Sequence, residues 1–263
     1  SRAEVAGIMA IIGFIGTGEI ASAMVNGITN QGHKIYVSKR GIKYAAKLAL
    51  LNDVQITSNQ ELIDKSDIII LCLLKNTAQE VLPKLNFKKD KKIISVMVDV
   101  SFNDLKTLCN PAQEIEITIP LPFIAGGNCP LPCYPTGTIV SELFSKKNRI
   151  FVVNSEVGLN AHFAVSAMAS VILFQAKISS KWLSHFTNDK ENSEAYILEM
   201  LGEYLSNVSR SNNIDLSNAL DSLNTPGGLN QTLRNHMEAS NISDNLVAGL
   251  DGFRDRLKLN VKG

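Results

Sequence analysis

A short glycine-rich segment near the N-terminus constrains the fold of this chain more than any other feature. Gly13-Phe14-Ile15-Gly16-Thr17-Gly18-Glu19-Ile20-Ala21 places the pattern G-x-G-x-x-A between a predicted strand, Ile11–Gly16, and a predicted helix, Glu19–Asn30. Gly16 permits a tight turn, Gly18 lets a pyrophosphate approach the amides of the helix N-terminus, and Ala21 keeps the helix close to the sheet. The segment predicts a dinucleotide-binding α/β domain.

Apolar runs and helical patterns alternate over the first 154 residues, which predicts βαβ units and a parallel, doubly wound sheet of the Rossmann type. Further strands are predicted at Lys34–Ser38, Val54–Ile56, Asp67–Leu73, Lys92–Val98, Glu114–Ile119 and Arg149–Val153, and helices at Tyr44–Leu51, Thr77–Leu85, Phe102–Leu108 and Ile139–Phe144. The proline-rich segment Pro120–Pro135 is predicted to be irregular, and the basic cluster Lys88–Lys92 to be a solvated turn.

After residue 154 only helical patterns remain, at Phe163–Lys177, Glu194–Val208, Asn218–Leu223, Leu229–Ala239 and Ile242–Leu257. We therefore predict a dinucleotide-binding domain over 9–154 and a helical substrate and dimerisation domain over 155–263. Residues 1–8 precede the first methionine and are expected to be a leader outside the fold. The uncharged segment Ala161–Ala176 predicts a helix buried on all sides, in the interface of a homodimer or higher homo-oligomer.

The composition excludes several classes of protein. A net charge of +1, with 45% apolar and 19% charged residues, argues for a globular chain and against nucleic-acid binding through bulk charge. Four cysteines are too few for a disulfide scaffold. No apolar run predicts a membrane span, and without a secretory signal the expected location is the cytoplasm. Cys129 and Cys133 have no companion pair with zinc spacing, so we expect free thiols in a loop and no metal site.

The residues that follow the second predicted strand indicate which dinucleotide is bound. An NAD site usually has an acidic residue there, which holds the ribose hydroxyls. This chain has Ser38, Lys39 and Arg40 instead. A hydroxyl and two cations suit a 2′-phosphate, because Lys and Arg form charge-assisted hydrogen bonds with phosphate. The sequence therefore favours NADP(H), with NAD(H) as the second choice.

A second glycine-containing turn, Thr225-Pro226-Gly227-Gly228, precedes the helix predicted at Leu229–Ala239. Thr225 suits a helix N-cap and Pro226 the first helical position. Two glycines in a first turn cost helix stability, which is reasonable where a ligand must touch the backbone. A helix N-terminus without side chains binds anions, so the turn predicts a site for a small carboxylate.

Three segments together resemble the Δ1-pyrroline-5-carboxylate reductases: the residues 12–21, Ser66-Asp67-Ile68-Ile69-Ile70-Leu71-Cys72-Leu73-Leu74-Lys75, and Thr225-Pro226-Gly227-Gly228. That family reduces a cyclic imine to L-proline with NAD(P)H and dimerises through its helical domain. The resemblance implies cofactor contacts at Gly16, Thr17, Gly18, Glu19, Ile20, Ala21, Ser38, Asn59, Leu73, Leu74 and Lys75, beside Lys39 and Arg40. It implies substrate contacts at Pro226, Gly227, Gly228 and Leu229, and catalytic roles for Thr225 and Asn230.

The substrate half departs from the family pattern. Leu229 and Asn230 stand where the family has two threonines or Ala-Thr, and Ile117–Phe123 lacks the arginine and asparagine of the family's segment. Two alternatives to pyrroline-5-carboxylate reduction therefore stay open. One is an NADP-linked oxidoreductase for another small carboxylate, either a hydroxyacid or a different cyclic imine. The other is a dinucleotide-binding regulatory protein without turnover.

Overall fold

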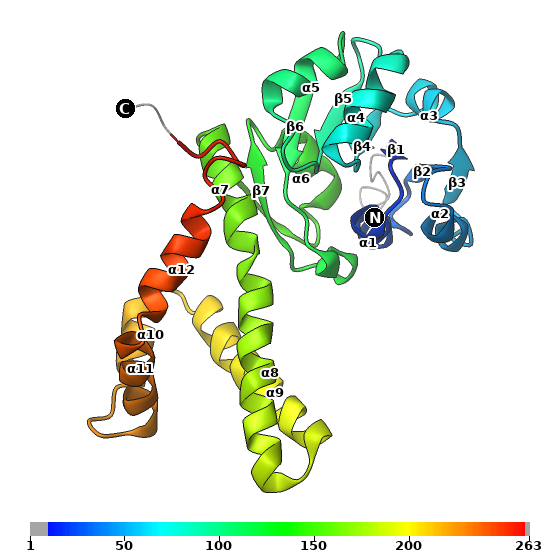
Figure 1. The fold of residues 1–263 in the computed structure, drawn as a ribbon. Coiled ribbons are helices and arrows are strands. Elements are labelled where there is room, and N and C mark those ends of the chain that lie inside the picture. The colour runs from blue at the N-terminus through cyan, green and yellow to red at the C-terminus, as the bar shows by residue number, and fades with distance from the viewer. Residues whose placement is uncertain (1–9, 261–263) are drawn as a thin grey trace. The chain divides into compact units, whose positions relative to one another are not determined.

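The computed structural model describes residues 10–260 (Figure 1), so the expected leader at residues 1–8 lies outside the described residues. The described chain forms two compact units. Residues 10–163 and 255–260 make up the first unit, and residues 164–254 the second. The change from alternating to purely helical structure follows the last strand, which ends at Val152. Residues 155–163 and 255–260, which the sequence assigned to the helical domain, belong to the first compact unit.

The first unit is built on an eight-stranded sheet with the order β3-β2-β1-β4-β5-β6-β7-β8. β1 to β6 are parallel, β7 runs antiparallel to β6, and β8 is parallel to β7. The predicted Rossmann-type architecture is confirmed. The strands are β1 (Ile11–Ile15), β2 (Lys34–Ser38), β3 (Val54–Thr57), β4 (Ile68–Leu71), β5 (Lys92–Ser95), β6 (Glu114–Thr118), β7 (Pro130–Tyr134) and β8 (Arg149–Val152).

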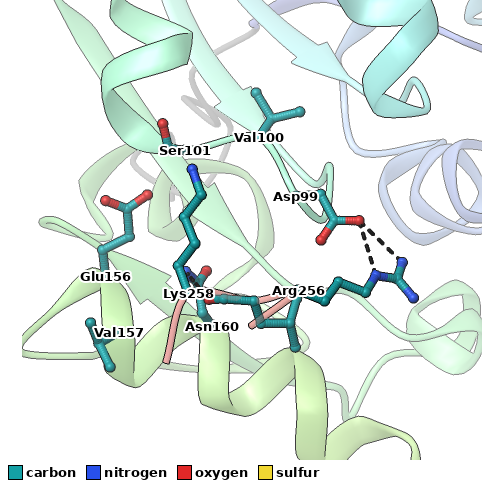
Figure 2. A pocket seen from close by; sticks show the side chains of 9 residues that line it. Asp99, Val100, Ser101, Glu156, Val157, Asn160, Arg256 and Lys258 are labelled. Atoms are coloured by element: carbon teal, nitrogen blue, oxygen red, sulfur yellow. Dashed lines mark hydrogen bonds and ion pairs between the residues drawn. The ribbon is translucent and has the colours of Figure 1, made fainter. Parts of the chain in front are cut away.

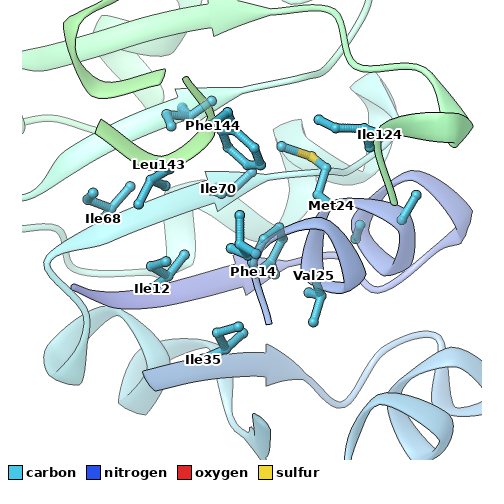
Figure 3. Close-up of a cluster of buried hydrophobic side chains, with 14 of the residues drawn as sticks. Ile12, Phe14, Met24, Val25, Ile35, Ile68, Ile70, Ile124, Leu143 and Phe144 are labelled. Atoms are coloured by element: carbon cyan, nitrogen blue, oxygen red, sulfur yellow. The ribbon is translucent and has the colours of Figure 1, made fainter. Parts of the chain in front are cut away.

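Helices cover both faces of this sheet, so its central strands are apolar throughout. One core lies beneath α1 (Glu19–Ile28), α2 (Ile42–Leu48), the 3₁₀ helix η2 (Pro122–Gly126) and α6 (Thr138–Phe144), as Figure 3 shows. The other core lies beneath α3 (Asn59–Lys65), α4 (Lys75–Val81), η1 (Leu82–Lys84) and α5 (Phe102–Leu108). Strand residues alternate between the two cores: Ile68 and Ile70 face the first, Ile69 and Leu71 the second.

The expectation of an irregular segment at Pro120–Pro135 is wrong, because this segment holds η2 and β7. η2 packs closely on α1, since a β-carbon at Gly27 would lie 2.7 Å from the carbonyl oxygen of Ile124. β7 tolerates its prolines because its ladder to β6 consists of only Ile117↔Tyr134 and Thr118↔Cys133. On the β6 side, Pro130 and Pro132 extend past the end of this ladder, while on the other side β7 pairs with β8 from Pro130↔Arg149 to Cys133↔Val152.

The expectation of a solvated turn at Lys88–Lys92 is wrong for Lys91, which is buried. Its ammonium nitrogen donates to the carbonyl oxygen of Ser66 at 2.7 Å, at the C-terminal end of α3. A cation is favourable there because the last carbonyls of a helix carry partial negative charge.

The second unit is entirely helical. It contains the end of α7 (Glu156–Ser166), then α8 (Met168–Thr187), α9 (Lys190–Ser209), α10 (Leu216–Ser222), α11 (Leu229–Ala239) and α12 (Ile242–Asp251). α8 packs against α9, and α11 against α12. In the single chain only Ala164 and Ala176 of the stretch Ala161–Ala176 are buried, so the predicted burial of this helix depends on a second copy. By length and composition alone, the stretch Glu156–Thr187, which comprises α7 and α8, could cross a membrane.

A buried carboxylate ties β6 to α6. Glu116 is 2% exposed, and one oxygen, Oε1, accepts hydrogen bonds from the Thr136 hydroxyl (2.6 Å) and the Ile139 amide (3.1 Å). Its other oxygen, Oε2, accepts from the Val140 amide at 3.0 Å. Both amides belong to the first turn of α6, whose N-terminus has no side-chain cap of its own. Glu116 therefore supplies the missing cap from a neighbouring strand.

We expect Glu116→Ala to lower the free energy of unfolding by about 3 kcal/mol, because it leaves buried donors without an acceptor. Glu114→Ala removes an exposed carboxylate from the same strand and should change stability by less than about 0.5 kcal/mol. Denaturant unfolding followed by circular dichroism measures both. Equal losses for the two variants would contradict this assignment.

Candidate functional site

The residues predicted to bind a dinucleotide gather at one edge of the sheet. β1, β2, β3 and β4 are parallel neighbours, so the segments that follow them leave the sheet on the same side. β1 lies between β2 and β4, where the strand order reverses direction, which is where open α/β sheets bind their ligands. The segments there carry the predicted residues Gly16–Ala21, Ser38–Arg40, Asn59 and Leu73–Lys75.

The two glycines of the first turn have different surroundings. Gly16 has φ +91°, and a β-carbon on it would lie 2.5 Å from the carbonyl oxygen of Cys72. Gly18 is the N-cap residue of α1, in extended conformation, and a β-carbon on it would meet nothing within 4 Å. The fold itself therefore requires Gly16, whereas the space beside Gly18 is open to a ligand that approaches the first amides of α1.

Two buried hydroxyls hold this turn against the end of β2. Ser38 Oγ accepts a hydrogen bond from the Gly16 amide at 3.0 Å. Thr17 Oγ1 donates to the carbonyl oxygen of Ser38 at 2.9 Å and lies 3.2 Å from Ser38 Oγ. Ser38 was predicted to meet a 2′-phosphate, but it is 1% exposed and its hydroxyl faces the glycine turn. Sequence patterns of charge and glycine gave no sign of this hydroxyl pair.

The remaining predicted cofactor residues differ in exposure. Lys39 and Arg40 are exposed directly after β2, and Asn59 is half-buried at the start of α3. Leu74 is the exposed N-cap residue of α4, with Lys75 as the first helical residue. Leu73 is buried in the second core, and Glu19, Ile20 and Ala21 form the first turn of α1. This edge therefore offers the cations Lys39, Arg40 and Lys75 and the N-termini of α1, α3 and α4.

The predicted anion-binding turn belongs to the second unit and precedes α11. Gly227 has φ +70°, and its amide donates to Oε1 of Gln231 at 3.1 Å. The Gly228 amide donates to the carbonyl oxygen of Thr225 at 2.8 Å. The amides of Leu229 and Asn230 are the first two of the helix and have no acceptor within it. The Gln231 amide likewise precedes Thr232, whose amide donates to the carbonyl oxygen of Gly228. The amides of residues 229–231, and not those of the glycines, are therefore the donors available to a carboxylate.

A cavity of about 210 Å³ in the first unit is lined by none of the predicted site residues (Figure 2). Arg256 donates from Nε (3.2 Å) and from a terminal nitrogen (3.1 Å) to Oδ2 of Asp99, tying residues near the C-terminus to the loop after β5. Oδ1 of Asp99 is buried without a partner among the described residues. The Asn160 amide donates to the carbonyl oxygen of Leu257 at 3.1 Å. These contacts fasten the end of the chain to α7 and β5.

The cysteines offer no nucleophile or metal ligand. Cys129 and Cys133 are buried, and Cys133 lies in β7 rather than in the expected loop. Burial raises the pKa of Cys109 to about 12 and that of Cys133 to about 11, so both remain thiols near neutral pH. Within residues 10–260 no group of three or more His, Cys, Asp or Glu side chains could hold a metal ion.

Comparisons with known proteins agree with this geometry. Residues 11–99 match the family model described as NADP oxidoreductase, coenzyme F420-dependent. No curated protein sequence matches the chain significantly. Among solved structures, the 1-pyrroline-5-carboxylate reductase of Streptococcus pyogenes matches with a TM-score of 0.82 and 21% identity, over 95% of this chain and 98% of that one. The NADP-bound pyrroline carboxylate reductase of Plasmodium falciparum matches with a TM-score of 0.78 and 17% identity, over 95% and 97%.

The strand order and the glycine-rich sheet edge thus define a Rossmann-type α/β protein, whose residues 11–99 resemble an NADP oxidoreductase family. More particularly, the chain has the fold of the pyrroline-5-carboxylate reductases over nearly its whole length, which confirms the resemblance seen in the sequence. The reductase of Coxiella burnetii also matches, with a TM-score of 0.79 and 17% identity, over 97% of this chain and 100% of that one.

We expect Gly16→Ala to destabilise the protein by about 2–3 kcal/mol, because it combines a positive φ with a backbone clash. Gly18→Ala should cost about 1 kcal/mol at most, the penalty of alanine at an N-cap. Thermal unfolding without added ligand compares the two variants. The interpretation of Gly18 as a position kept open for a ligand fails if Gly18→Ala is as unstable as Gly16→Ala.

Proposed function

We propose that this protein reduces a cyclic imine carboxylate with NADPH, and that the substrate is 1-pyrroline-5-carboxylate, which becomes L-proline. The observation that carries the proposal is the combination, in one chain, of an open glycine turn at the sheet edge and a helix whose first-turn amides have no acceptor within it. Solved reductases of this name share the fold. By the same reasoning we place the protein in that family.

The residues at the sheet edge fit a dinucleotide. The open space at Gly18 admits a pyrophosphate to the N-terminus of α1, where the helix dipole favours negative charge. Lys39 and Arg40 are exposed after β2, on the turn that faces the adenosine ribose in folds of this type. NADPH, when bound, supplies the hydride for the reduction.

The protein's own contribution is to bind and orient. The free amides of Leu229 and Asn230 suit a carboxylate, whose charge the N-terminus of α11 stabilises. The Asn230 side chain is exposed beside them and would donate to the reacting nitrogen. A protonated imine is already electrophilic, so holding donor and acceptor in contact provides most of the rate enhancement. This agrees with the absence of an activated thiol among the described cysteines.

The direct test is NADPH oxidation by the purified protein with a panel of cyclic imines, keto acids and hydroxyacids. We expect turnover with 1-pyrroline-5-carboxylate. Asn230→Ala should lower kcat by about 2- to 13-fold, the value of one neutral hydrogen bond, whereas Asn235→Ala, on the same helix, should leave it unchanged.

The same panel tests the alternatives. Turnover of only other acids would support an oxidoreductase for a different small carboxylate, which Leu229 favours because it places an apolar side chain, 90% exposed, beside the anion-binding amides. Binding of NADPH without any turnover would support a regulatory protein.

Cofactor preference should follow the two cations after β2. Replacing both Lys39 and Arg40 with alanine should raise the Kd for NADPH by about 10- to 100-fold and leave that for NADH nearly unchanged, because only NADPH carries a 2′-phosphate. Nicotinamide fluorescence measures both constants. Lys43→Ala, which removes a lysine in α2, after the turn that carries the two cations, serves as the control and should change neither constant. Equal weakening of both dinucleotides would show that these cations do not meet the 2′-phosphate.

The apolar surface of the second unit supports assembly with a second copy. A stripe along α8 is exposed at helical spacing, formed by Val171, Phe174, Ile178, Trp182 and Phe186. The Phe174 side chain, near the middle of the stripe, is 61% exposed. Contiguous apolar patches of this kind usually mark an interface. We propose that a second copy covers this stripe in a homodimer, with no membrane and no nucleic acid as partner, and that the protein works in the cytoplasm.

Light scattering in detergent-free buffer at micromolar concentration should give the mass of a dimer or a larger assembly. Phe174→Ser combined with Ile178→Ser should shift the protein toward monomer or aggregate, because both substitutions remove apolar area from the stripe. Lys181→Ser, exposed on the same helix, is the control and should not. A monodisperse wild-type monomer would refute the dimer, and a requirement for detergent would favour a membrane instead.

A further inference from the structure

The hydroxyls of Thr17 and Ser38 form a closed pair that leaves neither proton free. Thr17 Oγ1 donates its single proton to the carbonyl oxygen of Ser38. Ser38 Oγ already accepts from the Gly16 amide, so the 3.2 Å contact between the two hydroxyls is made by the Ser38 proton. A phosphate oxygen can only accept, and Ser38 therefore has no proton to offer one without breaking this pair.

Burial leads to the same conclusion. Thr17 is 3% exposed and Ser38 is 1% exposed, whereas Lys39 and Arg40, directly after Ser38, are exposed. A group that binds the 2′-phosphate must reach solvent from the sheet edge. The two cations do so and the serine hydroxyl does not.

The pair also controls where both ligand-facing turns lie. The backbone after β2 packs against the glycine turn so closely that a β-carbon at Gly41 would lie 1.9 Å from the carbonyl oxygen of Thr17. Residues 39 and 40 connect Ser38 to Gly41, so their position depends on this contact and on the hydroxyl pair. The Gly16 amide, held by Ser38, sets the start of the turn that leads to Gly18 and α1.

We propose that Thr17 and Ser38 are a positioning pair for dinucleotide binding, and that Ser38 is not a ligand of the 2′-phosphate. The pair holds the turn that receives the pyrophosphate, which NADPH and NADH share, and leaves discrimination between them to Lys39 and Arg40. This inference rests on the proposed function only in requiring that a dinucleotide binds at this edge.

The experiment measures Kd for NADPH and NADH by nicotinamide fluorescence, without substrate, for Ser38→Ala, Thr17→Val, Thr17→Ser and the double variant Thr17→Val with Ser38→Ala. Each loss of a hydroxyl should weaken both dinucleotides by the same factor, about 2- to 13-fold. The double variant should bind no more weakly than the weaker single variant, because both substitutions break one unit. Thr17→Ser keeps the hydroxyl and should bind as the wild type does.

A purely structural effect is distinguished by Glu116→Ala, which lowers stability far from this edge and should leave both Kd values unchanged below its melting temperature. If Ser38→Ala does not fold, Thr17→Val against Thr17→Ser carries the comparison alone. Weakening of NADPH only by Ser38→Ala, or additive losses in the double variant, would overturn the positioning pair while leaving the proposed function intact. A wild-type protein that binds neither dinucleotide would overturn both.

Discussion

Close backbone contact on both sides of the Gly16–Gly18 turn is the constraint on which the first unit depends. On one side the turn lies against the chain that follows β4, near Cys72, and on the other against Gly41 after β2. No side chain fits between these backbones, so glycine is required at Gly16 and at Gly41. Because β1 occupies the point where the strand order reverses, the same contacts create an open edge beside the N-terminus of α1.

The two units differ in how far they bury their apolar side chains. The sheet of the first unit has a packed core on each face, and its buried Glu116 and Lys91 side chains are hydrogen-bonded within the unit. The second unit buries few side chains, and the stripe on α8 remains exposed in the single chain. The proposed homodimer would cover this stripe and remove its apolar area from water.

The N-termini of α1 and α11, which the proposed function uses, differ in the contacts that surround them. At α1 the space beside Gly18 is open, and no side chain caps the helix. At α11 the Gln231 side chain already occupies the Gly227 amide, and Arg234 contacts the side chain of Asn224 just before the turn. These contacts hold the turn in shape and leave the amides of Leu229, Asn230 and Gln231 for a carboxylate. The anion site at α11 is therefore formed by the amides of the first helical turn and not by those of Gly227 and Gly228.

Periodicity and turn residues alone predicted the parallel sheet and several elements with their exact bounds, including Lys34–Ser38, Phe102–Leu108 and Leu229–Ala239. Such patterns are local, because the hydrophobic periodicity of a strand or an amphipathic helix depends on neighbouring residues. The tertiary structure alone decided that Pro130–Tyr134 pairs as a strand, that Ser38 faces the glycine turn, and that α8 is exposed in one chain. In the first two cases the contacts join residues more than ten positions apart in the sequence, and in the third no other described part of the chain covers the exposed face. A buried hydrogen bond or an uncovered surface therefore cannot be inferred from adjacent residues.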